Sequence, residues 1–477
     1  MNDNLIKEIT NKDVDFAKWY TDVVKKADLA DYSSVKGSMI IRPYGYAIWE
    51  NMQKILDKKF KETNHENIQM PMFIPESLLQ KEKDHVEGFA PEVAWVTHGG
   101  SEKLEEKMCV RPTSETLFCE HFKRIISSYR DLPLLYNQWC TIVRWEKTTR
   151  PFLRTREILW QEGHTMHSSK EDAVNETLRM LKIYEDFQKN ILAVPVITGK
   201  KTNKEKFAGA IDTYSVEAMM YDGIALQSAT SHYFGQGFSK AFDIKFLNKD
   251  NKLENPYQTS WGCTTRMIGE IIMVHSDNRG LVLPPRIAPY KVIIIPISND
   301  PLVSNTLNKI TGDLKSTDIT YKVDNSNKSP GFKFAESEVK GYPIRIEVGK
   351  RDISNGVVTL VRRDTLEKIQ TPIDEVIIKV NELLINIQND MYEKALKRRD
   401  EMTYNAMSKK EFEEYVKKPG FTFANWCESE ECELKIKDLY GVKTRCIPFE
   451  ENNPDGDKKC VCCGHDAKTK IYFAKQY

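Results

Sequence analysis

The chain has 477 residues, of which 40% are hydrophobic and 29% charged, and its formal net charge at pH 7 is +1. This composition is typical of a globular protein, and the length predicts two or three domains. The near-zero net charge excludes a broad basic field, so any contact with nucleic acid must come from local patches. The chain begins with the polar stretch MNDNLIKEITNK and has no apolar run of about 18 residues, so we expect no membrane span and a cytoplasmic location.

The segment from residue 44 to residue 130 predicts two helices and a strand. In YGYAIWENMQKILDKKFKE, residues 44–62, apolar side chains recur at helical spacing, which predicts a long amphipathic helix. NIQMPMFIP, residues 67–75, predicts a short strand with prolines at its limits. RPTSETLFCEHFKRIISSYR, residues 111–130, predicts a turn and then a helix capped by Thr113 or Ser114.

A hairpin with unusual side chains is expected next. QWCTIVRWE, residues 138–146, and EILWQEGHT, residues 157–165, both alternate in polarity, which predicts two strands. If their registers match, one face carries Ile142, Arg144, Glu146, Ile158, Trp160, Glu162 and His164. The connecting turn carries the cations Lys147, Arg150, Arg154 and Arg156.

These residue types suit a particular kind of ligand. A guanidinium binds a carboxylate or phosphate through two hydrogen bonds, and a cationic loop suits a polyphosphate. The row of acidic and aromatic side chains suits a small, partly apolar cation. A solvated charged hairpin would explain the arginines, but not why Trp160 and His164 share a face with Glu162. The combination therefore favours a nucleotide-binding site.

The remainder of the chain divides into two further units. EAMMYDGIALQS, residues 217–228, predicts a hairpin closed by its DG dipeptide. After GLVLPPRIAP the pattern changes, and the strands KVIIIPI, RIEVG and VVTLVRR precede a long amphipathic helix over residues 372–399. We therefore expect a first domain over residues 1–287, an α/β domain over residues 288–400 and a third unit over residues 401–477.

The third unit is rich in cysteine. Of the ten cysteines, six lie between residues 427 and 463, and such clustering in a cytosolic chain indicates metal rather than disulfides. Two close thiolate pairs, Cys427 with Cys432 and Cys460 with Cys463, predict a closed and structural tetrahedral Zn²⁺ site. Because the stretch reads CVCC, Cys462 is an alternative to Cys463, which we prefer for its two-residue spacing. Reduced free cysteines are the other alternative.

Several motifs, in the expected order, resemble one family of enzymes. VRWE with the returning strand is similar to motif 2 of class II aminoacyl-tRNA synthetases, NIQMPMFIP to motif 1, and SWGCTTRMIGEIIMVH to motif 3. CVRPTSET, FAPEVAWVT, RPFLRT, LWQEGHT and TSHYFGQ together resemble the prolyl-tRNA synthetase family in its archaeal/eukaryotic-like form. The similarity runs from about residue 16 to residue 477 and includes TRCIPF and the terminal FAKQY.

The resemblance implies a fold and an activity. The fold class would be α+β and α/β: an antiparallel catalytic sheet flanked by helices, an α/β anticodon-binding domain and a small zinc-binding α+β domain. The activity would be that of a proline–tRNA ligase, which uses ATP with Mg²⁺ to convert L-proline to prolyl-adenylate and then transfers the prolyl group to tRNA(Pro). The protein would be a homodimer, with Pro71 near the interface. No domain-sized insertion lies between residues 163 and 261, so we expect no inserted editing domain.

The resemblance also implies how ATP would bind. Arg144 would bridge the proline carboxylate and the α-phosphate, Arg154 would hold the β- and γ-phosphates, and Arg266 would stack on adenine. Additional nucleotide contacts would come from Glu146, Gln227, Thr230 and Thr264. For Thr264 a hydroxyl that only caps the backbone is an equal alternative. The family usually has phenylalanine where this chain has Ile158, so adenine stacking there would be weaker.

Proline would be held by a second set of residues. Thr113 and Glu115 would accept the two N–H donors of its secondary ammonium, and apolar walls would come from Phe89, Trp160 and His164. Polar members would be Glu162, His232 and Ser260. Taken alone, Phe89 would be interpreted as a core residue and His232 as a structural histidine. Only the family motifs that contain them favour a role in binding proline.

Anticodon contacts are expected in the α/β domain. The candidates are Phe334, Glu338, Arg345 and Glu347, because unpaired bases are recognised by stacking and by hydrogen bonds to their edges. A solvated strand face in RIEVGKRD is the alternative. Two other functions remain open: a class II synthetase for threonine or glycine, against which LWQEGHT and RPTSET argue, and a non-catalytic paralogue, against which the presence of Arg144, Arg154 and Arg266 argues.

Overall fold

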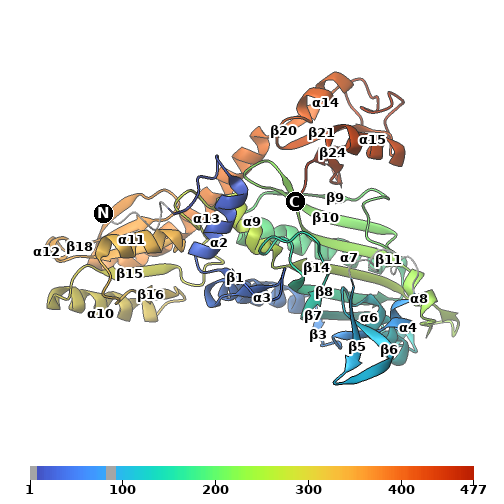
Figure 1. Ribbon diagram of the computed structural model, residues 1–477, viewed down its shortest axis with the longest axis horizontal. Coiled ribbons are helices and arrows are strands. Elements are labelled where there is room, and N and C mark those ends of the chain that lie inside the picture. The colour runs from blue at the N-terminus through green and yellow to red at the C-terminus, as the bar shows by residue number, and fades with distance from the viewer. Residues whose placement is uncertain (1–7, 82–92) are drawn as a thin grey trace.

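The computed structural model describes residues 8–81 and 93–477, which form three sheet-centred regions (Figure 1). The largest sheet has eight strands in the described residues, and every neighbouring pair is antiparallel except β3 with β7. In spatial order its strands are β23 (Ile447–Pro448), β9 (Val196–Lys200), β10 (Asp212–Met219), β11 (Ala225–Gly235), β14 (Tyr257–Thr264), β8 (Glu157–His167), β7 (Leu134–Val143) and β3 (Glu66–Asn67).

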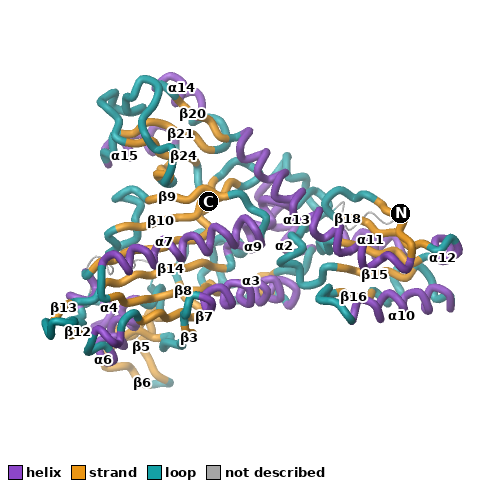
Figure 2. The backbone as a smooth tube through the Cα atoms, turned by 180° about the vertical axis from the view of Figure 1, so that it is seen from behind, coloured by secondary structure: helices purple, strands orange, loops and turns teal. Residues whose placement is uncertain are grey.

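Helices cover one face of this sheet. Helix α7 (Lys170–Asp186) packs on β11 and β14, with α9 (Arg266–His275) and α3 (Pro43–Glu62) beside it (Figure 2). The expected amphipathic helix over residues 44–62 is thus confirmed, and its apolar stripe packs Phe60 against Trp261 with ring centroids 5.0 Å apart. The ring of Trp261 also fills the space over Gly163, where any Cβ would lie 2.1 Å from it. On the opposite face α6 (Glu115–Ile125) and α8 (Gly237–Ala241) cover part of the sheet, and the area beside them is open to a ligand.

The expected strand over residues 67–75 is wrong in extent. Strand β3 ends at Asn67 and β4 (Phe73–Pro75) begins six residues later, so the stretch around Pro71 is not a strand. A proline lacks the N–H that a strand ladder needs. The guanidinium of Arg111 instead donates to the carbonyl oxygens of Met70 and Pro71, at 2.8 and 3.2 Å.

Helix α6 (Glu115–Ile125) begins directly after the predicted turn, and Ser114 occupies the N-cap position. The expected capping bond is absent, because the Ser114 hydroxyl donates to the buried carboxylate of Glu162 at 2.5 Å instead of accepting from the helix. The predicted hairpin over residues 217–228 is confirmed as β10–β11, and Gly223 at its turn has φ +76°.

Smaller elements complete the first region. These are α2 (Phe16–Lys26), β1 (Ala30–Tyr32), β2 (Met39–Ile41), α4 (Glu76–Leu79), β5 (Ala94–Gly99), β6 (Glu102–Val110), a 3₁₀ turn (Tyr129–Asp131), a π-helical turn (Phe187–Ile191), α8 (Gly237–Ala241), β12 (Phe246–Leu247) and β13 (Leu253–Glu254). Strands β4, β6 and β5 form a separate sheet. The described residues from 163 to 261 build β8, α7, β9–β14 and α8, with no further domain among them.

The second region is a five-stranded sheet with helices on both faces. Its strands, in spatial order, are β16 (Tyr321–Val323), β15 (Val292–Pro296), β17 (Ile344–Val348), β18 (Val357–Arg362) and β19 (Lys368–Pro372). Its helices are α10 (Pro301–Lys315), α11 (Pro330–Val339), α12 (Lys350–Ser354), a 3₁₀ turn (Ile373–Glu375) and α13 (Val376–Glu401). The three expected strands and the long helix are all present. Because β17 is buried throughout, the solvated strand face proposed as an alternative is wrong for residues 345–348, whereas Lys350 and Arg351 after the strand are exposed.

The third region follows α13, which leads to it from the second (Figure 1). It contains β20 (Thr403–Ala406), α14 (Lys409–Tyr415), β21 (Phe421–Trp426), α15 (Glu430–Tyr440), β22 (Lys443–Thr444) and β24 (Thr469–Ala474). Strand β23 leaves this region to pair with β9 of the large sheet. In residues 8–81 and 93–477 no helix is both long and apolar enough to cross a lipid bilayer.

Candidate active site

A cavity of about 190 Å³ lies on the face of the large sheet opposite α7, over strands β7, β8, β11 and β14. Thirteen of the residues expected at the site line it: Thr113, Glu115, Arg144, Ile158, Trp160, Glu162, His164, Gln227, Thr230, His232, Ser260, Thr264 and Arg266. They come from segments far apart in the sequence, which the sheet order brings together.

Strand register explains why these side chains share one face. Strands β7 and β8 pair Gln138 with Glu162 and Cys140 with Trp160. Residues directly opposite on neighbouring strands point to the same side of the sheet. On β8 the alternate residues point the other way, as Gln161 does where it accepts from the Tyr184 hydroxyl of α7. The alternation predicted from the sequence is therefore the alternation of the pocket floor.

Glu162 is the best-supported acidic group on this floor. Its carboxylate accepts hydrogen bonds from Ser114 Oγ and Gln138 Nε2, both at 2.5 Å, and from His164 Nε2 at 2.9 Å. Burial opposes ionisation, but the donors outweigh it and hold the pKa of Glu162 below its ordinary value. Since an ionised carboxylate only accepts, the His164 ring must donate from Nε2.

A second buried carboxylate lies beside the first. Glu115 accepts from Thr113 Oγ1 at 2.6 Å and from Ser260 Oγ at 3.4 Å, and all three residues are almost fully buried. The pocket therefore presents acceptor oxygens from two carboxylates, Glu115 and Glu162. Such a cluster attracts a cation.

His232 is held neutral between two threonines. Its Nδ1 lies 3.0 Å from Thr213 Oγ1, and its Nε2 lies 2.9 Å from Thr230 Oγ1. Burial, and then the nearby His164 ring, lower the pKa of His232 to about 3. The ring can therefore exchange hydrogen bonds but carries no charge at neutral pH.

Arginines gather at the other end of the cavity. Arg144 Nε donates to the carbonyl oxygen of Pro112 at 3.2 Å, and its guanidinium lies 5.4 Å from the Trp160 ring centroid. Arg266 donates to the carbonyl oxygens of Leu153 and Gln227, each at 3.2 Å. Burial, and then the charges of Arg144 and Arg154, lower the pKa of Arg266 to about 10. Mutually repelling guanidinium groups held together in this way favour an anionic ligand.

Arg154 and Glu146 lie at the rim and not among the cavity-lining residues. The Arg154 Nη1 and Glu146 Oε2 atoms are 3.6 Å apart. The expected strand over residues 138–146 is too long at its end, because β7 stops at Val143. Arg144 and Glu146 therefore lie beyond the strand, and Trp145 between them is half exposed. Thr264 lines the cavity, and its hydroxyl also accepts from the Arg266 N–H at 3.0 Å, as the backbone-capping alternative expected.

Some pocket residues were not expected from the sequence. Phe207 and Glu205, in the loop between β9 and β10, line the cavity, and the Phe207 ring centroid lies 4.6 Å from that of His232. No periodic pattern marks this loop, so neither helical nor strand spacing could have found it. Phe89, expected as an apolar wall, lies outside the described residues.

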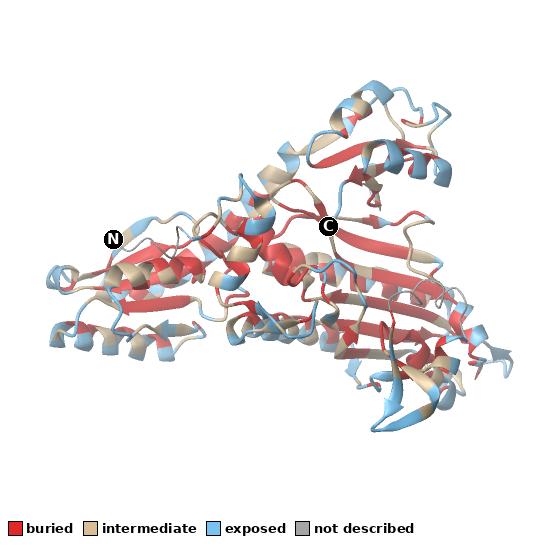
Figure 3. Cartoon of the chain, in the orientation of Figure 1, coloured by how far each residue is buried: buried red, intermediate tan, exposed pale blue. Residues whose placement is uncertain are grey.

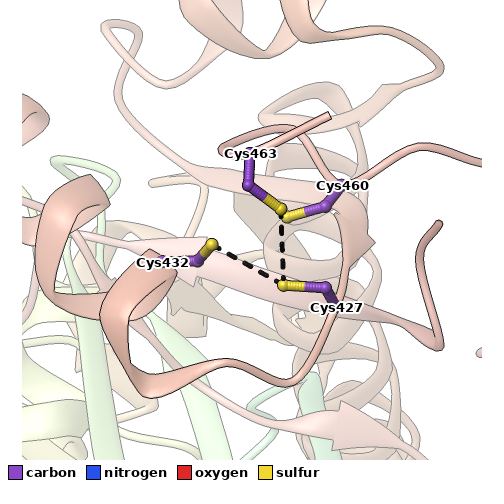
Figure 4. Close-up of side chains that lie close together, drawn as sticks. All are labelled: Cys427, Cys432, Cys460 and Cys463. Atoms are coloured by element: carbon purple, nitrogen blue, oxygen red, sulfur yellow. Dashed lines mark hydrogen bonds between the residues drawn. The ribbon is translucent and has the colours of Figure 1, made fainter. Parts of the chain in front are cut away.

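The expected metal ligands meet in the third region (Figure 4). The Sγ atoms of Cys427, Cys432, Cys460 and Cys463 all lie within 4.8 Å of one another. Cys427 Sγ is 3.6 Å from Cys432 Sγ and 3.8 Å from Cys463 Sγ. Four sulfurs about 2.3 Å from one tetrahedral Zn²⁺ would be separated by about 3.8 Å. The geometry therefore fits zinc, and it includes Cys463 rather than Cys462.

The four anticodon candidates also lie together. Arg345 of β17 pairs with Glu338 at 3.0 Å and with Glu347 at 2.8 Å, and its guanidinium lies 4.6 Å from the Phe334 ring centroid. The three charged residues are largely buried.

Comparison with known proteins identifies related sequences for each region. The family described as "tRNA synthetase class II core domain (G, H, P, S and T)" matches residues 95–275, "Anticodon binding domain" matches residues 291–383, and "Prolyl-tRNA synthetase, C-terminal" matches residues 409–477.

Relatives of similar length match almost the whole chain. A proline–tRNA ligase of Clostridium novyi is 59% identical over 474 residues, which is 99% of this chain and 98% of the relative. Another, from Ruminiclostridium cellulolyticum, is 58% identical over 475 residues and 99% of each chain. The crystal structure of prolyl-tRNA synthetase from Cryptosporidium parvum, complexed with halofuginone and AMPPNP, is 41% identical, covers 99% of this chain and 100% of its own, and has a TM-score of 0.95. The chain belongs to the prolyl-tRNA synthetase family of class II aminoacyl-tRNA synthetases.

Proposed function

We propose that this protein is a proline–tRNA ligase, which forms prolyl-adenylate from L-proline and ATP and then transfers the prolyl group to tRNA(Pro). The observation that carries the proposal is the single cavity in which two buried carboxylates, Glu115 and Glu162, lie at one end and two arginines, Arg144 and Arg266, lie at the other. The first end suits an ammonium group and the second suits a carboxylate and phosphates.

The first step needs positioning more than proton transfer. The carboxylate of proline is ionised at neutral pH, so it can attack the α-phosphorus without a general base. Arg144, at the arginine end of the cavity, would hold the carboxylate against the α-phosphate and stabilise the charge that develops there. The oxygen–phosphorus bond forms as the bond to pyrophosphate breaks.

The nucleotide would occupy the arginine end. Arg266 and Ile158 would lie on the two sides of adenine, with Glu146 accepting from its amino group, and Arg154 at the rim would hold the β- and γ-phosphates. Gln227, Thr230 and Thr264 would supply further polar contacts. Mg²⁺ enters with the phosphates and shares their charge, and phosphate and water oxygens supply most of its ligands. The similar structure in complex with AMPPNP, an analogue of ATP, supports ATP as the nucleotide.

Proline would occupy the carboxylate end. Its secondary ammonium would donate to Thr113 and Glu115, whose oxygens the structure holds 2.6 Å apart. Trp160, His164 and Phe89 would contact the ring, while Glu162, His232 and Ser260 would fix these groups in place.

Pyrophosphate exchange tests the amino-acid assignment. The protein is incubated with ATP, labelled pyrophosphate and proline, alanine, cysteine or threonine in turn. We expect the highest kcat/KM with proline and weak exchange with alanine and cysteine, because missing methylenes cost only about 1–3 kcal/mol each. Threonine as the preferred substrate would contradict the proposal, and no exchange with any of the four would favour a non-catalytic paralogue.

Transfer to tRNA would use the second region. Phe334, Glu338, Arg345 and Glu347 are proposed to contact unpaired anticodon bases. An Arg–Glu cluster beside an aromatic ring offers both base stacking and edge hydrogen bonds. The domain division proposed with this function is residues 1–287, 288–400 and 401–477. A cytoplasmic location, where ATP and tRNA are present, is part of the same proposal.

The four clustered cysteines are proposed to hold a structural Zn²⁺. Their thiolates fill a tetrahedral coordination shell and leave no position for a substrate. Elemental analysis should find one zinc per chain in the purified protein. A Cys427→Ser variant should lose it, and a Cys462→Ser variant should keep it; loss from the second variant would contradict the choice of Cys463.

A homodimer is also proposed. Strands β5 and β6 project from the large region with exposed surfaces (Figure 3). Met72 and Phe73, at the start of β4 and next to Pro71, are 45% and 42% exposed. Adjacent exposed apolar side chains of this kind are typical of an interaction surface. Light scattering after size exclusion should give twice the chain mass of 55.2 kDa, and a Phe73→Asp variant should shift the mass towards the monomer.

A further inference from the structure

The loop that walls the proposed proline pocket is held from outside by the cysteine-rich region. This loop, residues 201–211, joins β9 to β10 and contributes Glu205 and Phe207 to the cavity. Lys201 donates to the carbonyl oxygen of Arg445 at 2.6 Å. Lys443 lies 3.5 Å from Glu205. Both partners belong to the third region, so the pocket wall is shared between the first and third regions.

A further buried contact between the loop and the third region passes through Thr202 and Glu433, which are 4% and 5% exposed. The Thr202 hydroxyl donates to Glu433 Oε1 at 3.1 Å and accepts from the backbone N–H of Glu205 at 3.2 Å. Thr444 Oγ1 donates to the same Oε1 atom. Glu433 thus sets the direction of a hydroxyl that in turn fixes the first turn of the loop.

The turn started at Thr202 leads directly to the pocket. The Lys206 N–H donates to the Thr202 carbonyl oxygen at 3.0 Å. Next, the Phe207 N–H donates to Thr213 Oγ1 at 2.9 Å, the hydroxyl that also lies 3.0 Å from His232 Nδ1. A displaced Thr202 would therefore shift both the Phe207 ring and the hydrogen-bond chain of His232.

We propose that Glu433 is a positioning residue for amino-acid binding: from the cysteine-rich region it orients Thr202 and thereby sets the place of Phe207 at the proline end of the cavity. This inference rests on the proposed function, since it assumes that proline binds at that end. None of these hydrogen bonds leads from Glu433 to Arg144 or Arg266. A change at Glu433 should therefore affect KM for proline and not KM for ATP.

Pyrophosphate exchange on the full-length protein tests this role, with KM measured separately for proline and ATP. Glu433→Ala should raise KM for proline about two- to tenfold, the effect of one lost hydrogen bond, and change KM for ATP by less than about twofold. Glu433→Gln should behave like the unaltered protein, because its single amide oxygen can accept from both threonine hydroxyls. Thr202→Val should match Glu433→Ala, and the double variant should be no worse than either alone.

The matched control is Glu430→Ala. Glu430 lies on the same helix and 3.9 Å from Lys204 of the same loop, but it is 67% exposed. The inference is wrong if Glu433→Ala and Thr202→Val behave like this control, if Glu433→Gln is as impaired as Glu433→Ala, or if both KM values rise together. If the unaltered protein shows no exchange with proline, the proposed function fails instead, and the two failures are thereby distinguished.

Discussion

The pocket floor and the Arg345 cluster both bury acidic side chains, but they stabilise them by different means. Glu162 accepts hydrogen bonds from the Ser114 hydroxyl, the Gln138 amide and the His164 ring, and no arginine or lysine of the described residues forms an ion pair with it. Glu338 and Glu347 are instead paired with the guanidinium of Arg345. Hydroxyl and amide donors fix the geometry of a carboxylate without adding a compensating charge. The first arrangement therefore keeps a charge for a cationic ligand, whereas the second neutralises its own.

Removal of an arginine at the pocket should have the largest effect. Arg144→Ala should lower proline-dependent pyrophosphate exchange by about 10³- to 10⁵-fold, because the variant loses both the positioning and the charge at the α-phosphate. The unfolding temperature and zinc content should stay unchanged. Arg124→Ala, on the exposed side of α6, is the control and should keep full activity. Retained exchange in Arg144→Ala would refute its role.

Removal of Arg345 should lower stability and spare pyrophosphate exchange, the opposite of what is expected for Arg144→Ala. Arg345→Ala removes the shared guanidinium from two buried carboxylates and leaves Glu338 with Arg279 and Glu347 with Lys368. The lost charged hydrogen bonds should lower the free energy of unfolding by about 2–3 kcal/mol. Exchange with proline should persist below the new unfolding temperature, while KM for tRNA in aminoacylation rises. Arg351→Ala, which removes an exposed charge from the neighbouring helix α12, should change neither quantity. A parallel fall of exchange would mean that the two regions are not independent.

The protonation of Glu162 gives a pH-dependent test. Its folded pKa is lowered, so its ionised form stabilises the fold at pH values above the unfolded pKa of about 4.3, and this stability is lost as the pH falls through the folded pKa. Glu162→Gln should cost about 1–3 kcal/mol at pH 7, because the buried donors lose a charged acceptor. The difference from the unaltered protein should shrink below about pH 4. Chemical unfolding at pH 7 and pH 4 measures it, with Glu62→Gln on the surface of α3 as control.

The smallest effect is expected at the adenine side of the pocket. Ile158→Phe restores the aromatic face usual in the family and should lower KM for ATP about two- to tenfold, from about 0.5–1.5 kcal/mol of added stacking. KM for proline should not change. Ile158→Leu, which adds no aromatic face, serves as the control. An unchanged KM for ATP in the phenylalanine variant would indicate that adenine does not lie against this residue.

Much of this architecture could be predicted from the sequence because it repeats with a regular period. The alternation in β7 and β8 indicated which side chains share a face, and the spacing in α3 indicated its buried stripe. The motifs and their order along the chain indicated the family. Periodicity carried no information about the choice of Ser114 between the helix N–H and Glu162, because that choice depends on a partner from another strand.

Irregular segments account for the other differences. Phe207 lies in a loop without a repeating pattern, and its position depends on Thr213 and on the distant third region. The break around Pro71 depends on Arg111, which supplies the donors that the strand lacks. Contacts between distant segments decide these features, and local spacing does not encode them.

The short strand β23 has a consequence for solubility. Open sheet edges present unpaired amide groups that invite another chain to add a strand. Among residues 8–81 and 93–477, the outermost strands of the large sheet are the two-residue strands β23 on one side and β3 on the other. A chain cut before residue 447 would bare the edge of β9, so nicked or truncated material should form aggregates through backbone pairing.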